Sequence, residues 1–222
     1  MIINNVKLVL ENEVVHGSLE VQDGEGGWLL PGLIELHTDN LDKFFTPRPK
    51  VDWPAHSAMS SHDALMVASG ITTVLDAVAI GDVRDGGDRL ENLEKMINAI
   101  EETQKRGVNR AEHRLHLRCE LPHHTTLPLF EKLAQLGLLD ILSSDYYPAS
   151  LLDAAFRVAD DQSNRFTLPQ AVRLVTKNPA QALNLQDRGV IGEGNRADLV
   201  LAHRKGNHIH IDHVWRQGKR VF

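Results

Sequence analysis

The sequence predicts an α/β fold in which a parallel βαβ core is inserted between two β-rich ends. Apolar and polar residues alternate in the first 21 residues and again from residue 197 to the end. Between them, strand-like and helix-like segments follow one another in the order that implies parallel strands with right-handed crossovers. The two ends are therefore expected to pair in one small discontinuous sheet, with the α/β part between them.

The N-terminal segment predicts two antiparallel strands, because its apolar residues fall in short runs separated by Glu11-Asn12. The run WLLPGLIEL at 28–36 is apolar throughout and bounded by glycines. Such a run is typical of one strand buried on both faces, as in a parallel sheet.

The middle of the chain predicts alternating helices and strands. Residues 44–54 are rich in proline and charge and predict a loop, and Ser60-Ser61 are suited to capping the next helix. The β-branched segment 71–80 predicts a strand, and the amphipathic stretch after it predicts a helix ended by Gly107. Further strands are expected at 116–121 and 138–144, and three more in the tail. Helices are expected at 127–135, 150–159, 168–176 and 179–183, with Thr167 as the cap of the third.

Composition is typical of a globular protein, with 42% hydrophobic and 24% charged residues. The net charge of −6 argues against non-specific nucleic-acid binding, and no run of 18 apolar residues suggests a membrane span. The single cysteine, Cys119, fits a reducing compartment, and no signal peptide is expected at the start. A cytoplasmic location is therefore expected. Twelve histidines favour a metal or acid–base site.

Two candidate ligand groups follow predicted strands. His37 and Asp39 lie two residues apart just after the first buried strand, so both side chains are able to face one metal ion. Asp145 follows the strand 138–144, at the sheet edge that carries the chemistry of barrel enzymes. The alternatives are a surface turn for the His-x-Asp pair and a helix-capping role for Asp145.

Two further residues are weaker candidates. Glu120 ends the third strand and is able to bridge two divalent ions, or alternatively to pair with Arg118 or Arg114. Arg48 lies in the proline-rich loop and suits phosphate recognition, although the residues alone favour a solvated loop.

The segments GWLLPGLIELHTDN at 27–40, ITTVLDAV at 71–78 and VTKNPAQALNLQDRGVIGEGNRADLVLA at 175–202 resemble motifs of the amidohydrolase superfamily. The resemblance implies a (β/α) TIM-like barrel with a small β domain built from both termini. It divides the chain into 1–26 (small β domain), 27–188 (barrel) and 189–222 (small β domain).

Within that superfamily, HTDNLDKFFTPRP, RCELPHH and LLDILSSDYYPASLL resemble the members that act in phosphonate metabolism. The resemblance implies a hydrolase that releases pyrophosphate from α-D-ribose 1-methylphosphonate 5-triphosphate. It implies a divalent metal, either zinc or manganese/magnesium, held by His37, Asp39, Glu120 and Asp145. Asp145 is then the general base, and Arg48 and Arg118 contact phosphate.

The barrel is expected to be incomplete, with about four of the family's eight strands. Only some two dozen residues separate Glu120 from Asp145, whereas one βαβ crossover takes roughly thirty. This internal deletion removes the histidines that complete the family's metal site, so low or absent turnover is expected. Because open strand edges and an uncovered apolar face would remain, the chain is expected to form a homo-oligomer, to rearrange or to be poorly soluble. The alternatives are an amidohydrolase acting on a cyclic amide or nucleobase, which Asp39 disfavours, and a non-catalytic remnant that binds pathway partners.

Overall fold

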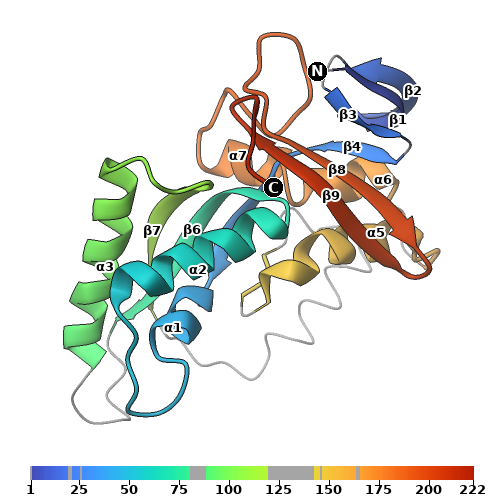
Figure 1. The fold of residues 1–222 in the computed structure, drawn as a ribbon. Helices are drawn as coiled ribbons and strands as arrows, with labels where there is room; N and C mark the ends of the chain where they lie inside the picture. The colour runs from blue at the N-terminus through green and yellow to red at the C-terminus, as the bar shows by residue number, and fades with distance from the viewer. Residues whose placement is uncertain are drawn as a thin grey trace.

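The two ends of the chain meet in one seven-stranded sheet (Figure 1), as the alternation at both ends predicts. The computed structural model describes residues 2–19, 22–25, 27–80, 89–119, 143–145, 147–163 and 166–222. The strand order is β10-β9-β8-β4-β1-β2, and β3 pairs with β1 outside this path. The strands are β1 (Ile2–Val9), β2 (Val14–Leu19), β3 (Gln22–Glu25), β4 (Trp28–Pro31), β8 (Leu199–Lys205), β9 (His208–Arg216) and β10 (Lys219–Arg220).

Tight turns set the register of this terminal sheet. The amide of Leu10 donates to the carbonyl of Glu13 at 2.9 Å and closes the β1–β2 hairpin around the predicted break. Gly206 has a φ of +63° and closes the β8–β9 hairpin, a conformation that costs glycine little. One core cluster joins the two ends of the chain: Val6, Leu29, Leu199, Leu201 and Trp215.

The middle of the chain forms a parallel sheet in the order β5-β6-β7. Its strands are β5 (Leu33–Thr38), β6 (Ile71–Ile80) and β7 (Glu112–Cys119). Thr38 of β5 also forms a parallel bridge with Asp145. The end of the predicted strand 138–144 therefore lies along the edge of β5 away from β6, while most of that predicted strand lies outside the described residues. Four chain segments thus run in parallel, which is the start of a barrel.

The predicted single strand at 28–36 is in fact two strands that belong to different sheets. β4 pairs antiparallel with β8, whereas β5 pairs parallel with β6. Gly32 lies between them, and a Cβ there would lie 2.4 Å from Oγ1 of Thr72. Only glycine allows the chain to pass this closely from one sheet to the other. The division of the chain at residues 26 and 188 stays a prediction.

Helices cover one face of the parallel sheet. Figure 1 shows α1, α2 and α3 on the same side of β6 and β7, and side chains from α1, α2, β6 and α3 share one buried cluster. Of the other helices, α5 contacts β9 and α6 contacts β1 in the terminal sheet, whereas α7 contacts β5 of the parallel sheet. The helices are α1 (Asn40–Phe45), α2 (Ala55–Ala68), α3 (Arg89–Lys105), η1 (Pro148–Ser150, a 3-10 turn), α5 (Leu151–Asp160), α6 (Leu168–Arg173) and α7 (Lys177–Ala182).

Several predicted element ends were wrong. α2 begins at Ala55, not at the Ser60-Ser61 pair, because the carbonyl of Pro54 accepts from the amides of Ser57 and Ala58. Helix α1 was not predicted, and β7 begins at Glu112, four residues before the expected start. The predicted cap of α6 is confirmed, because the Thr167 side chain accepts from the amide of Gln170 in a capping box. The predicted helix at 127–135 lies outside the described residues.

A cluster of ion pairs holds the C-terminal loop against the amino end of β7. Glu112 accepts from Arg188 at 2.6 Å, from Arg196 at 2.9 Å and from Arg114 at 2.7 Å. Burial alone raises the pKa of Glu112, but the hydrogen bonds from the three arginines outweigh it and lower the pKa to about 2. Arg196 also pairs with Asp198 at the start of β8, so this cluster links the two sheets.

Candidate metal centre

The end of β5 and the segment at Asp145 carry the candidate ligands. The amide of Asp145 donates to the carbonyl of His37 at 3.1 Å, and the amide of Asp39 donates to the carbonyl of Asp145 at 3.2 Å. The Thr38 hydroxyl donates to the same carbonyl at 2.5 Å. These bonds hold Asp145 at a φ of 53°, a strained value for a residue with a side chain. Strained backbone of this kind is concentrated at functional sites.

His37, Asp39 and Asp145 converge as the sequence predicts. The Nε2 atom of His37 lies 3.5 Å from Oδ1 of Asp145 and 3.9 Å from Oδ2 of Asp39. All three ligand atoms lie within 4.8 Å of one another. Asp39 is buried, whereas His37 and Asp145 are partly exposed, so the group is open to solvent on one side.

These three residues fit a divalent cation. The Oδ1 atom of Asp145 is buried and has no hydrogen-bond partner among the described residues, an arrangement that costs free energy unless a positive group satisfies it. One imidazole and two carboxylates are the ligand types that zinc accepts, and carboxylate oxygen also suits manganese and magnesium.

A buried glutamate of β5, Glu35, links the two segments that carry the candidate ligands. Glu35 is 0% exposed and accepts hydrogen bonds from the amides of His37 at 3.0 Å and Ser144 at 2.8 Å. It therefore ties the two segments that supply the ligands. Burial raises the pKa of Glu35 to about 7, although these hydrogen bonds act in the opposite direction. Sequence reasoning missed Glu35, although it lies two residues before His37 and so faces the same side of β5.

His116 of β7 also borders the centre and was not predicted. Its ring meets that of His37 edge to face, with ring centroids 5.0 Å apart. The alternation along β7 places His116 and Leu115 on opposite faces of the sheet.

The described part of the structure does not place the other predicted site residues at the candidate metal centre. Glu120 lies outside the described residues, as does the side chain of Arg118. Arg48 is exposed in the loop after α1, where its backbone bridges to Val51. Their roles stay predictions.

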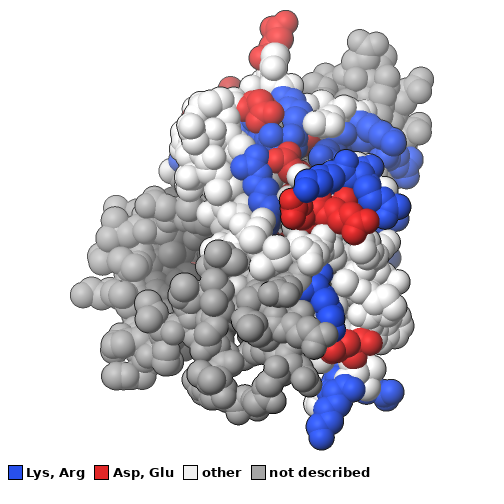
Figure 2. Space-filling model, turned by 90° about the vertical axis from the view of Figure 1, so that its left-hand side faces the viewer, with Lys and Arg blue, Asp and Glu red and all other residues white. Residues whose placement is uncertain are grey.

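Charges of both signs are mixed on the surface in Figure 2, where Lys and Arg lie beside Asp and Glu among the described residues of that face. No helix within the described part of the chain has the length and apolar character needed to cross a membrane.

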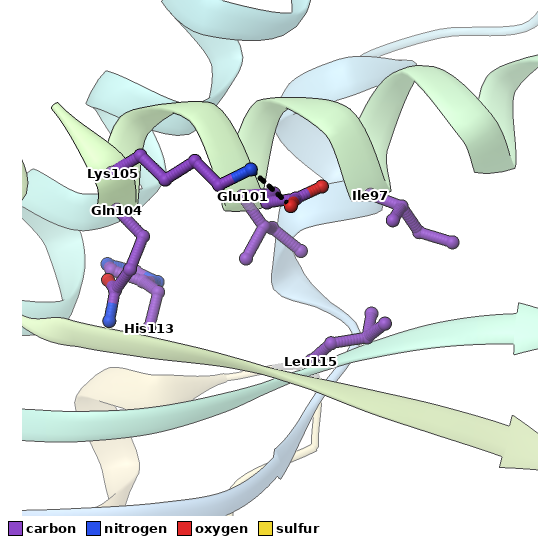
Figure 3. A pocket seen from close by; sticks show the side chains of 7 residues that line it. Ile97, Glu101, Gln104, Lys105, His113 and Leu115 are labelled. Carbon is purple, nitrogen blue, oxygen red and sulfur yellow. Dashed lines mark hydrogen bonds and ion pairs between the residues drawn. The ribbon is translucent and has the colours of Figure 1, made fainter.

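An apolar groove of about 400 Å³ lies on the other face of β7, between that strand and α3 (Figure 3). Ile97, Ile100 and Leu115 line it, with the Lys105–Glu101 pair at its rim. Leu115 is 41% exposed. Because Leu115 and His116 point to opposite faces, this groove is separate from the candidate metal centre.

A second group of titratable residues is fully buried and was also missed. His62 of α2, Asp76 of β6 and His113 of β7 place three possible ligand atoms within 4.8 Å of one another. The Nε2 atom of His62 lies 2.6 Å from Oδ1 of Asp76, and Nδ1 of His113 lies 2.8 Å from Oδ2. These are direct hydrogen bonds, so the imidazoles and the carboxylate satisfy one another without a cation.

Comparison with curated proteins finds a relative of the same kind that the motifs suggest. The chain is 58% identical over 378 residues to "Alpha-D-ribose 1-methylphosphonate 5-triphosphate diphosphatase" of Escherichia coli (strain K12), with 100% of each chain covered. The difference between 378 and this chain's 222 residues leaves at least 156 positions without a counterpart. Since 58% of 378 is about 219, nearly all residues of this chain are identical to the relative's. The predicted internal deletion is therefore confirmed.

Solved structures agree on the fold. N-acetylglucosamine-6-phosphate deacetylase from Pasteurella multocida matches with a TM-score of 0.61 at 11% identity, covering 99% of this chain and 98% of the other. The enzyme of the same name from Thermotoga maritima matches with a TM-score of 0.58 at 14% identity, covering 100% and 99%. Together with the parallel sheet of the described residues, these likenesses confirm the predicted α/β fold with a partial barrel.

The sequence profile of the Amidohydrolase family matches residues 111–222, about half of the chain. Together with the full-length relative and the convergence of His37, Asp39 and Asp145, this match shows that the chain belongs to the amidohydrolase family.

Proposed function

We propose that the chain is a metal-dependent hydrolase that releases pyrophosphate from α-D-ribose 1-methylphosphonate 5-triphosphate in phosphonate catabolism, at a low rate because its barrel is shortened. The convergence of His37, Asp39 and Asp145 carries the proposal. The near-identity of this chain to the corresponding parts of the E. coli diphosphatase supports the substrate. The single cysteine supports a cytoplasmic location.

His37, Asp39 and Asp145 would hold the cation, with Glu120 as a further proposed ligand. A divalent ion supplies positive charge that stabilises the phosphoryl oxygens in the transition state. Zinc suits the imidazole, and manganese or magnesium suits the carboxylates. The chain offers both ligand types, so both metals belong in the assay.

The proton transfer falls to Asp145 in this proposal. A water oxygen forms a bond to phosphorus, the α–β phosphoanhydride bond breaks, and pyrophosphate leaves. Asp145 accepts the proton that the attacking water loses. Its carboxylate is partly exposed on the open side of the centre, which allows a substrate to approach. Arg48 and Arg118 are the proposed contacts to the phosphate oxygens.

The test is pyrophosphate release by the purified chain with added zinc or manganese, alongside the E. coli relative. We expect metal-dependent release that is slower than that of the relative. Absence of pyrophosphate at every metal concentration would overturn the proposed activity. Tight stoichiometric metal uptake without turnover would then leave the chain as a metal-binding remnant.

An amidohydrolase acting on a cyclic amide or nucleobase is the second candidate, because the family match does not specify the substrate. Profiling of cyclic amides and nucleobases in the same assay separates the two, since only the first proposal expects pyrophosphate.

The exposed groove beside Leu115 supports a homo-oligomer, which would cover apolar surface that a shortened barrel leaves open. Sedimentation of the chain against a Leu115→Lys variant tests this proposal. A monomer in both samples contradicts it.

A further inference from the structure

A continuous line of hydrogen bonds runs from Asp145 of the candidate metal centre into the layer between the parallel sheet and α2. The hydroxyl of Thr38 donates to the carbonyl of Asp145 and accepts from the amide of Asn40 at 3.2 Å. The Asn40 side-chain amide then contacts Nδ1 of His62 at 3.1 Å. The line therefore starts at the two segments that supply the proposed ligands.

Beyond His62 the line continues through charged groups. His62 contacts Asp76, and Asp76 contacts His113 through its second oxygen. The Nε2 atom of His113 lies 3.1 Å from Oδ1 of Asp63, whose carboxylate also accepts from the amides of Arg110 and Ala111. We name this chain of groups, Asn40–His62–Asp76–His113–Asp63, the buried ladder.

The partners fix the donor and acceptor roles along the buried ladder. His62 faces a carboxylate at Nε2, so that nitrogen donates, and it faces the Asn40 amide group at Nδ1, so that nitrogen accepts. His113 faces a carboxylate at each nitrogen, so both donate and the ring is charged. All of these side chains are 5% exposed or less, so water does not compete for their hydrogen bonds.

We propose that Asn40 and His62 are positioning residues for the metal centre. Asn40 directly follows Asp39 at the start of α1, a helix of only six residues. The Asp39 side chain makes no capping hydrogen bond at that start. The bond from Asn40 to His62 anchors this turn to α2, and the bond from its backbone amide to Thr38 anchors it to Asp145. The buried ladder thereby holds Asp39 and Asp145 at the separation that one cation requires. This inference rests on the proposed function.

Asn40→Ala is the direct test, with two readouts that need no turnover. We expect the amides of Asp39 and Asp145 to exchange hydrogen about tenfold faster, the effect of losing one buried hydrogen bond. We also expect the dissociation constant for zinc, measured by competition with a chelator, to rise at least about tenfold, as for other outer partners of metal ligands.

The matched control is Thr103→Val. Thr103 is equally buried, in α3, and its hydroxyl contacts the carbonyl of Ala99 at 2.7 Å and the side chain of Asn109 at 3.1 Å. The substitution removes buried hydrogen bonds outside the buried ladder. We expect unchanged zinc affinity and unchanged exchange at Asp39 and Asp145. Equal losses in the control would overturn the inference, because general destabilisation would then explain both.

Asn40→Asp keeps the link and serves as the conservative variant. A carboxylate at this position would place His62 between two carboxylates, which is the arrangement that His113 already has in the buried ladder. We expect slow exchange at Asp39 and Asp145 to be retained. This variant decides the matter if Asn40→Ala does not fold, since fast exchange in folded Asn40→Asp contradicts the inference.

The inference and the proposed function fail in different ways. If the Asn40→Ala variant exchanges the amide hydrogens of Asp39 and Asp145 as slowly as the unmutated chain and binds zinc as tightly, the positioning role is overturned. This holds whatever substrate the chain hydrolyses. Absence of pyrophosphate release from the unmutated chain overturns the activity, while the exchange measurement still decides the role of the buried ladder.

Discussion

The Nε2 atom of His37 lies 3.5 Å from Oδ1 of Asp145, and that carboxylate oxygen is buried without a hydrogen bond from the part of the chain that the structure describes. Asp145→Asn removes the negative charge while keeping the shape. We expect zinc affinity to fall at least about tenfold, because even partners outside the ligand set contribute that much. Chelator competition measures the change. Asp160→Asn makes the same substitution on the exposed face of α5 and should bind zinc as the unmutated chain does.

The charge on His113 predicts how stability depends on pH. Burial alone lowers the pKa of His113, but the charge of Asp76 and the hydrogen bonds to Asp63 and Asp76 outweigh it and raise the pKa to about 9. A raised pKa means that the folded state holds a proton that the unfolded chain loses above about 6.5. This contribution, roughly 3 kcal/mol, is therefore complete below pH 6.5 and is lost as the pH rises through 9. Urea unfolding with a chelator present, between pH 6 and 10, measures this contribution. An unfolding free energy that does not change with pH would contradict the prediction.

Glu112→Gln tests the cluster of ion pairs at the amino end of β7, the end away from the candidate metal centre. The change removes the carboxylate that Arg188 and Arg196 share and leaves Arg188 paired with the more exposed Asp187. We expect a loss of about 3 kcal/mol in unfolding free energy at pH 7. Because the pKa of Glu112 is lowered to about 2, its stabilisation is present above pH 4.5 and is lost as the pH falls towards 2. The variant and the unmutated chain should thus converge in acid. Zinc affinity should not change, and a large fall would mean that the two ends of the sheet are coupled.

Gly32→Ala should strain the junction between β4 and β5. The added methyl group would lie 2.4 Å from Oγ1 and 2.7 Å from Cγ2 of Thr72. We expect a cost of about 1–3 kcal/mol, as for other overpacked sites, measured by thermal unfolding. Gly192→Ala is the control, since its nearest contact is a flexible Asn195 side chain at 3.1 Å.

The double variant Gly32→Ala with Thr72→Ala completes this experiment. Removal of the Thr72 hydroxyl and methyl should recover part of the loss, and a double-mutant cycle isolates the interaction. Simple additivity of the two losses would show that Thr72 is not the obstacle.

Sequence reasoning predicted the parts of the fold that depend on local periodicity. The strand 71–80, the helix ended by Gly107 and the capping box at Thr167 are all present because neighbouring residues alone specify them. It failed at Gly32, where an unbroken apolar run passes between two sheets. Nothing in that run shows the close approach to Thr72, which is a contact between distant segments.

The candidate site shows the same limit. His37, Asp39 and Asp145 were predictable, because a family motif and the ends of parallel strands point to them. Glu35 and the buried ladder were not, because a lone buried carboxylate or histidine is recognisable only from its partners. His62 and His113 lie far apart in sequence and meet through Asp76.

The pairing of β4 with β8 joins the beginning of the chain to its end. It therefore closes a loop whose length depends on how many residues the middle of the chain contains. The free-energy cost of closing a loop grows only with the logarithm of its length, by about 0.6 kcal/mol for each doubling. The alignment leaves at least 156 positions of the relative without a counterpart in this chain, enough to roughly double the span between these two strands. The terminal sheet therefore forms at nearly the same entropic cost with or without those residues. The stability of the pairing between the two chain ends thus depends little on the length of the barrel segment between them.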